Sequence, residues 1–330
     1  MKRRSLGHWA TAAYAILITL WFALRLVFRD SYWLLWLANS GAKYLFIPMP
    51  LLLAVSLSPR HRSGLVWLSL PIAAFGLLYG HLFLPSAQAR PEPRAPLLRV
   101  MTFNVLNVST DYDAAAQAIL SEEADLVGLQ ELIPANAAAL EERIGARFPY
   151  HTPLPTEHRL QVALFSRFPI REWSELNLPW LDLSVHAVVD IDGTALHVFV
   201  LHFVPTLLSE VPLVEWPTRV AEREAIRTDQ IGRLLRALPD SGEPALILCD
   251  CNFTETSAAY AEVDTRLQDS FAEVGWGFGH TIRPLKMNLA LQRIDYVWHS
   301  SQLLVLSAEV VHAGGSDHYP VVAAFTLREP

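Results

Sequence analysis

Long apolar runs near the N-terminus limit what this chain can fold into more than any other feature. Trp9–Phe28 is a run of 20 residues whose single charge, Arg25, lies near its end, and Leu65–Leu84 is a second run of that length. A shorter run, Tyr44–Leu57, continues an earlier apolar patch, Tyr32–Ala38, across a break of small residues. A hydrocarbon core of ~30 Å is crossed by ~20 apolar residues in a helix. We therefore expect about three transmembrane helices within residues 1–84.

The middle run decides the topology. The densest basic clusters, Lys2–Arg4 and Arg60–Arg62, should both face the cytoplasm. Three spans then place everything after Leu84 outside the cytoplasm, whereas two spans would return it to the inside. We expect three spans, in a plasma or inner membrane. The alternatives are buried helices of a large globular domain, or release after Ala87–Ala89, which resembles a cleavage site.

The remainder of the chain differs in composition. Residues 85–96 contain four prolines and read as an extended linker. Residues 1–94 hold 10 basic and 2 acidic residues, whereas residues 95–330 hold 16 basic and 31 acidic residues, a net charge of −15. With only 2 cysteines, the chain is not a disulfide-rich scaffold. Residues 97–328 therefore read as an acidic, soluble domain.

Strands and helices alternate in this domain, which indicates an α/β protein. An Asp192-Gly193 pair, a strong turn signal, predicts a hairpin. Strands are expected at Leu97–Val105, Asp125–Gln130, Gln161–Ser166, Ser184–Asp190, Ala195–Phe203, Ala245–Asp250, Arg293–His299 and Val321–Leu327. Helices are expected at Tyr112–Glu122, Ala135–Phe148 and Val220–Leu238.

Polar residues fall where the apolar strands begin or end. They are Asn104, Glu131, His202, Asp250, Asn252, Asp295, Asp317 and His318. Strand ends meet at one rim of a sheet, where sites are usually built. So many buried polar groups would cost several kcal/mol if nothing neutralised them. Carboxylate and amide oxygens suit Mg²⁺ or Mn²⁺, so we expect a divalent cation at this rim.

Seven short motifs carry a family resemblance. In chain order they are Thr102-Phe103-Asn104, Gln130-Glu131, Ser166–Ile170, Leu201-His202, Asp250-Cys251-Asn252, Arg293–Tyr296 and Ser316–Val321. Together they resemble the endonuclease/exonuclease/phosphatase superfamily, which includes deoxyribonuclease I and the neutral sphingomyelinases. The resemblance covers residues 97–328 and implies a four-layer α/β sandwich, with two mixed sheets face to face and helices outside.

The resemblance also implies a metal site. Glu131 matches the main ligand of the cation, with Asn104 beside it and Asp317 nearby. The cation would be Mg²⁺ or Mn²⁺, which neutralises charge on the phosphoryl oxygens.

Catalytic roles are implied in the same way. Asp250 and Asn252 match a pair that orients the attacking water and binds a phosphoryl oxygen. Asp295 matches the acid that orients a terminal histidine, here His318. His202 matches a second histidine, a candidate acid for the leaving group. Phosphoryl transfer requires neutralised charge on the phosphoryl oxygens, an attacking water in line, and a proton for the leaving oxygen.

Two cysteines depart from the family pattern, which usually has glycine at position 249. Residues two apart in a strand share a face but lie ~6.6 Å apart. We therefore expect Cys249 and Cys251 to be small apolar strand residues without a mutual disulfide. A metal site made by the cysteine pair would suit zinc rather than this oxygen-rich set.

The family alone does not decide the substrate. An acidic domain is a poor general binder of nucleic acid, which is held through Lys and Arg. The apolar segments Phe203–Thr218 and Leu176–Leu183 suit either core packing or contact with a lipid surface. We expect a membrane-anchored hydrolase of a lipid-linked or other extracytoplasmic phosphoester. The alternatives are an extracytoplasmic nuclease and a catalytically silent binding module.

Overall fold

The structure is a computed structural model of the chain, divided into two compact units. It describes residues 6–58, 61–84, 97–157, 160–180, 184–239, 242–283 and 289–327. The first unit comprises Met1–Leu84, Leu208–Ala221 and Thr256–Ala258, and the second comprises the remaining residues. The linker expected at residues 85–96 lies outside the described residues.

Helices make up the described part of the first unit. They are α1 (Leu6–Phe28), α2 (Trp33–Ser40), η1 (Ala42–Phe46), α3 (Pro48–Ser56), α4 (Ser63–Tyr79) and η2 (Gly80–Phe83), with the short turns η3 (Leu208–Glu210) and η4 (Leu213–Glu215). Trp21 Nε1 donates to Asn39 Oδ1 at 3.1 Å, and Asn39 Nδ2 donates to Asp30 Oδ1 at 2.6 Å. These bonds satisfy the polar groups that lie among apolar helices.

Two stretches, Gly7–Phe28 and Ser63–Phe83, are long and apolar enough to cross a membrane. The middle run instead gives a shorter helical stretch, Ala42–Ser56. The apolar run from Tyr32 to Leu57 is interrupted twice. Gly41 ends α2, and Pro48 starts α3 and has no N–H to continue a preceding helix. The three expected spans therefore reduce to two candidates by length and composition, a test that buried core helices and signal sequences also pass.

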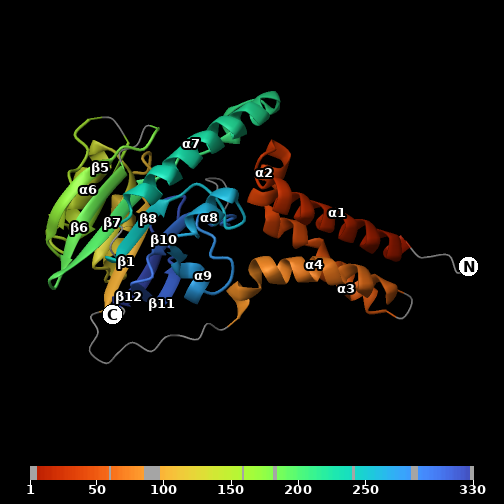
Figure 1. Cartoon of the computed structure of the whole chain (residues 1–330). Coiled ribbons are helices and arrows are strands. Elements are labelled where there is room, and N and C mark those ends of the chain that lie inside the picture. The colour runs from red at the N-terminus through yellow and green to blue at the C-terminus, as the bar shows by residue number, and fades with distance from the viewer. Residues whose placement is uncertain are drawn as a thin grey trace, which may run out of the picture. The chain divides into compact units, whose positions relative to one another are not determined.

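Two mixed six-stranded sheets form the second unit (Figure 1). Sheet A has the order β11-β12-β1-β2-β4-β3, and sheet B has the order β5-β6-β7-β8-β10-β9. Sheet A comprises β1 (Leu98–Asn104), β2 (Leu126–Leu132), β3 (Tyr150–His151), β4 (Gln161–Ser166), β11 (Leu303–Val310) and β12 (Val321–Leu327). Sheet B comprises β5 (Ile170–Leu176), β6 (Ser184–Ile191), β7 (Thr194–His202), β8 (Ala245–Asp250), β9 (Gln268–Asp269) and β10 (Asp295–His299).

Each sheet contains one parallel pair near its centre. β1 pairs with β2 through the crossover helix α5 (Tyr112–Ser121), and β7 pairs with β8 through α7 (Trp216–Ala237). All other pairings are antiparallel, including the expected hairpin of β6 and β7 around Asp192 and Gly193, which both have positive φ. Parallel pairing brings the carboxyl ends of the two strands to the same rim.

Three apolar layers hold the sandwich together. The inner faces of the sheets interdigitate through residues such as Val100 and Leu248, both fully buried. The outer face of sheet A packs on α5 and α6 (Pro134–Ile144). The outer face of sheet B packs on α7 and α8 (Ala258–Val263), and α9 (Ser270–Val274) contributes Phe271 to the inner layer. The predicted sandwich of two mixed sheets with outer helices is confirmed.

Some elements were not predicted from the sequence. The most informative is β5, because its five central residues are exposed and lack the alternation that marks a half-buried strand. The short strands β3 and β9, the strand β11 and the short helices α8 and α9 were also missed. α7 begins at Trp216, four residues earlier than expected.

Candidate functional site

The inner faces of the strands become polar toward one rim. Residues two apart on a strand share a face, so Val100, Thr102 and Asn104 of β1 lead from the apolar layer to the rim. β8 does the same with Leu248 and then Asp250. Because the apolar layer holds the sheets together below, the rim can gather polar side chains from both sheets.

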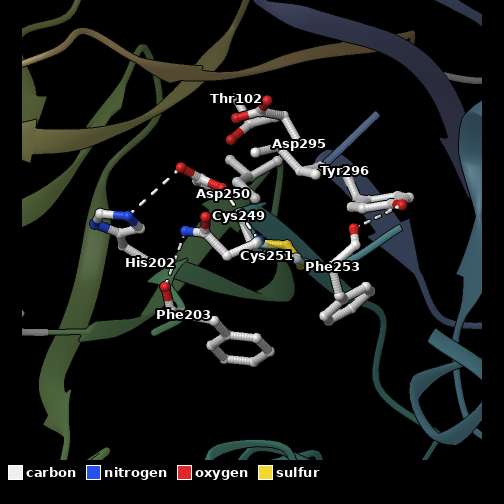
Figure 2. Close-up of a disulfide and its surroundings, with 12 residues drawn as sticks. Thr102, His202, Phe203, Cys249, Asp250, Cys251, Phe253, Asp295 and Tyr296 are labelled. Carbon is white, nitrogen blue, oxygen red and sulfur yellow. Dashed lines mark hydrogen bonds and ion pairs between the residues drawn. A yellow bond between two sulfur atoms is a disulfide. The ribbon is translucent and has the colours of Figure 1, made fainter. Parts of the chain in front are cut away.

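Strand register sets three site residues side by side. His202 of β7 lies opposite Asp250 of β8, and Asp250 lies opposite Asp295 of β10. All three are at least nine-tenths buried. His202 Nε2 lies 3.5 Å from Asp250 Oδ2, as Figure 2 shows with a dashed line. Sheet B therefore supplies a row of two carboxylates and a histidine to the rim.

Sheet A supplies Asn104 and Glu131. Asn104 Nδ2 donates to Glu131 Oε1 at 3.0 Å and to Asp250 Oδ2 at 2.8 Å, which links the two sheets. Its Oδ1 accepts from the Leu106 amide at 3.0 Å. Asn104 is fully buried, so this one amide sets the separation of two carboxylates.

Glu131 reaches the rim through an irregular backbone. Gln130 faces inward and donates to Thr102 Oγ1 at 3.0 Å, so regular alternation would point Glu131 outward. The pairing of β2 with β4 shifts between Leu129 and Leu132, and Glu131 adopts φ +59°. A bulge of this kind re-aims a side chain. The left-handed backbone of Glu131 is therefore strain located at the site.

His318 and Asp295 form a buried pair. His318 Nδ1 lies 2.9 Å from Asp295 Oδ2 and 3.1 Å from Oδ1, and His318 Nε2 lies 3.7 Å from Asp250 Oδ2. Burial alone would lower the pKa of His318, but the carboxylates of Asp295 and Asp250 outweigh it and raise the pKa to about 10. The imidazole is therefore held as a cation that faces Asp250.

Burial acts on the carboxyl groups in the opposite direction. It raises the pKa of Asp250, as does the Asp295 carboxylate, while His318 and His202 oppose the rise. Burial likewise raises the pKa of Asp317, which is only half-buried. Clustered, buried acids of this kind favour a bound cation, because a cation restores the charged forms.

Asn252 also lies at the end of β8. Its Nδ2 donates to the Phe203 carbonyl at 3.0 Å, and its amide donates to Asp250 Oδ1 at 3.2 Å. Asn252 has φ +51°, a conformation that asparagine tolerates better than most residues. The side-chain amide of Asn252 is thereby held by the Phe203 carbonyl, and its backbone is held by the Asp250 carboxylate.

Three further residues that the sequence analysis assigned no role support the site. Asn107 donates to Glu131 Oε2 from its side chain at 2.7 Å and from its amide at 3.1 Å. Ser316 Oγ donates to the Asn104 carbonyl at 2.8 Å and accepts from the His318 amide at 3.1 Å. Arg283 donates to the Ser316 carbonyl at 2.6 Å. Ser316 lies in a recognised motif, but loop residues such as Asn107 follow no periodicity and leave no sequence signal.

The expectation that Cys249 and Cys251 are not bonded to each other is wrong. The two sulfurs form a disulfide (Figure 2), and the Cα atoms lie 5.2 Å apart. The cysteines are closer than strand geometry predicts because β8 ends at Asp250, so Cys251 no longer follows extended geometry. Both cysteines are buried in the apolar layer on the outer face of sheet B.

The residues present fit a metal ion. Glu131, His202 and Asp250 each offer one ligand atom, and these atoms lie within 4.8 Å of one another; Asp250, Asp295 and His318 do the same. The sets share Asp250 and are rich in carboxylate oxygen, the donor that hard divalent cations prefer.

Two mixed sheets with a rim of carboxylates, amides and histidines are consistent with a phosphoester hydrolase fold. The sequence profile of the endonuclease/exonuclease/phosphatase family matches residues 101–318. The chain belongs to this family. A comparison with curated protein sequences gives no match.

Solved structures share the fold. A family member from Bacteroides vulgatus has a TM-score of 0.58 and 19% identity, covering 71% of this chain and 100% of its own. A mannosyl-6-phosphatase from Bacteroides thetaiotaomicron has a TM-score of 0.52 and 16% identity, and the match covers 70% of this chain and 100% of that chain. The beta toxin of Staphylococcus aureus has a TM-score of 0.52 and 18% identity, and the match covers 68% of this chain and 99% of that chain. At these identities the similarity establishes the fold only.

Proposed function

We propose that this chain is a membrane-anchored, divalent-metal-dependent phosphoester hydrolase that acts on a lipid-linked phosphoester outside the cytoplasm. One observation carries the hydrolase activity: the His318–Asp295 pair faces Asp250, and Asn104 ties Asp250 to Glu131. Proton-handling groups and cation-holding groups therefore share one buried rim.

Glu131 would hold the cation, with Asn104 and Asp317 as further oxygen ligands. For Asn104 this requires the side-chain amide to turn, because its Nδ2 faces Glu131 and Asp250 and its Oδ1 accepts from the Leu106 amide. Bound Mg²⁺ or Mn²⁺ would supply Lewis-acid neutralisation of the phosphoryl oxygens. Asn107 supports this role, because its two hydrogen bonds to Glu131 Oε2 orient the carboxylate and leave Oε1 toward Asn104.

The remaining residues would handle protons and orientation. Asp250 and Asn252 orient the attacking water and bind a phosphoryl oxygen, which is the positioning that in-line displacement requires. His318, held protonated by Asp295, stabilises negative charge that develops on the phosphoryl group. His202 Nε2, 3.5 Å from Asp250, donates a proton to the leaving oxygen.

Charge and exposed apolar side chains favour a lipid over a nucleic acid. Residues 95–330 carry a net charge of −15, which opposes a polyanion. Segment Leu208–Ala221 belongs to the same compact unit as the apolar helices, and within it Leu213 and Val214 are 63% and 83% exposed. Exposed apolar residues of a membrane unit suit contact with a bilayer. Five residues, 203–207, separate this segment from His202 in the chain.

Charge and cysteine chemistry support a catalytic unit outside the cytoplasm. Three spans would place the catalytic unit outside the cytoplasm, because the basic clusters Lys2–Arg4 and Arg60–Arg62 remain inside. The third span would be made from Ala42–Ser56 and the helices before it. The Cys249–Cys251 disulfide supports this side of the membrane, since disulfides persist in oxidising compartments.

The direct test measures hydrolysis by the full chain in lipid nanodiscs with Mg²⁺ or Mn²⁺. Substrates are sphingomyelin and glycerophospholipid vesicles, supercoiled DNA, single-stranded RNA and inositol phosphates. We expect release of a phosphorylated headgroup or free phosphate from lipid, abolished by chelation and by Glu131→Ala.

Two other outcomes would each favour an alternative function. DNA or RNA cleavage without lipid cleavage would make the chain a tethered nuclease. Failure on every substrate, together with no metal-dependent rise in the melting temperature, would reject the hydrolase in favour of a silent binding module.

A further inference from the structure

The disulfide lies directly behind a catalytic candidate. Cys249 and Cys251 flank Asp250, and their relative exposures are 0% and 1%. Both sulfurs sit in the apolar layer with Phe253 and Tyr296, whereas the Asp250 carboxylate points away toward the rim (Figure 2). The covalent link and the carboxylate therefore occupy opposite sides of one short piece of backbone.

That piece of backbone is contracted. Residues two apart in a regular strand have Cα atoms ~6.6 Å apart, whereas Cys249 and Cys251 are 5.2 Å apart. β8 ends between them, at Asp250, and Asn252 follows with φ +51°. The disulfide spans the point where the strand turns, so it restrains the turn itself.

Backbone hydrogen bonds also hold this turn. The Cys251 amide donates to the Ile294 carbonyl at 2.8 Å, and the Phe203 amide donates to the Asp250 carbonyl at 2.9 Å. Such bonds open and re-form with thermal motion, whereas the covalent bond does not. A catalytic group misplaced by ~1 Å costs ~100-fold in rate. A covalent restraint at this point therefore affects the positions of the Asp250 and Asn252 side chains.

We propose that the Cys249–Cys251 disulfide is a positioning element of the active site: it fixes the end of β8 so that Asp250 and Asn252 face the substrate, and the oxidised chain is the active form. The inference rests on the proposed hydrolase function. Reduction would pass two electrons and two protons from a dithiol to the disulfide, so the chain gains two thiols and the dithiol becomes a cyclic disulfide. Oxidation by a disulfide reagent would reverse it.

The first experiment counts thiols and then removes them. The full chain is purified without reductant, unfolded, and treated with iodoacetamide; since the chain has 2 cysteines, an unmodified mass shows the disulfide. Cys249→Ala, Cys251→Ala and the double variant are then assayed on the substrate that wild type hydrolyses. We expect kcat to fall ~10- to 100-fold, equally in all three variants, with KM within threefold.

Equal losses are the signature of the bond, because removing either cysteine destroys it and the second substitution then adds nothing. Ile247→Val is the packing control, since Ile247 is fully buried in the same apolar layer and on the same face of β8. It should lower the melting temperature and leave kcat unchanged. Reduction of wild type by dithiothreitol should reproduce the loss, and oxidised glutathione should restore the rate.

The proposal is overturned if purified wild type carries two free thiols, if the two single losses add in the double variant, or if kcat is unchanged in all three. Should wild type hydrolyse nothing, the proposed function fails while the positioning claim is still decided by Mn²⁺. A rise in melting temperature with Mn²⁺ that is lost in the double variant supports the positioning role, and an equal rise in both proteins rejects it.

Discussion

Single residues connect the two sheets at this site. Asn104 bonds to a carboxylate from each sheet, and Glu131 and Asn252 both adopt a backbone conformation with positive φ. Sequence motifs identified these residues, but not the contacts that orient them. Asn107 bonds to Glu131, and Ser316 bonds to the Asn104 carbonyl. Ser316 lies in a recognised motif, but Asn107 lies in a loop where neither periodicity nor composition marks a partner.

Asp295→Asn tests the role of the buried pair. The amide would keep the shape of the side chain but remove the charge that stabilises protonated His318. We expect kcat to fall by about 10²- to 10⁴-fold, with KM within threefold. Asp192→Asn, the same chemical change in the exposed β6–β7 turn, should leave kcat unchanged. A rate within threefold of wild type for Asp295→Asn would remove the pair from the mechanism.

At the scale of elements, burial explains which predictions succeeded. β4, β8 and β12 were predicted with their observed bounds, because each is a nearly continuous buried apolar run. β5 was missed because its exposed residues carry no hydrophobic pattern. The helix expected in the middle apolar run is longer than the observed helices, because Gly41 and Pro48 interrupt it. The turn after Asp250 was also missed, since strand geometry was extended one residue too far.

The contact between the sheets depends on one glycine. A Cβ at Gly128 would lie 2.8 Å from Leu248 Cβ and 3.2 Å from Val200 Cγ1, so Gly128→Ala overpacks the inner layer. We expect a loss of about 1–3 kcal/mol in the free energy of unfolding. Gly232→Ala in α7 is the matched control, because its Cβ would meet only the flexible Arg236 guanidinium. It should stabilise the chain by about 0.5–1 kcal/mol. Thermal unfolding of both variants and of wild type measures these changes. If Gly128→Ala were as stable as wild type, the close approach of the two sheets at Gly128 would be refuted.

A histidine stack on sheet B makes stability depend on pH. Burial and the neighbouring His197 lower the pKa of His186 from 6.5 to about 4. Its Nε2 lies 2.9 Å from His197 Nδ1, and His197 Nε2 lies 2.9 Å from Glu243. Between those pKa values the unfolded chain binds a proton that the folded chain does not, so stability falls as the pH drops from 6.5 toward 4.

His186→Gln should remove that part of the pH dependence. After allowance for solvent screening, the contribution is about 1–2 kcal/mol. We therefore expect the variant to lose less melting temperature than wild type between pH 7 and pH 4.5. Parallel curves for His186→Gln and wild type would show that the stack does not disfavour the charged form.

At the scale of the whole molecule, the number of membrane spans decides on which side of the membrane the second unit lies. Two candidate spans would leave the catalytic unit on the side of the N-terminus, whereas three would place it on the opposite side. We expect a C-terminal alkaline phosphatase fusion to be active and a C-terminal green fluorescent protein fusion to be dark in a bacterial host. Fusions after residue 62 should show the reverse pattern. A fluorescent C-terminal fusion would establish an even number of spans and place the second unit in the cytoplasm.

The order of strands in sheet A also has a consequence for how the protein is made. β1 lies between β12 and β2, so one of its two edges stays open until the last strand has been synthesised. The site is likewise incomplete until His318 emerges, 214 residues after Asn104. A nascent chain that is still being translated therefore lacks an assembled site, and the site can form only after synthesis has passed His318 and the closing strand β12.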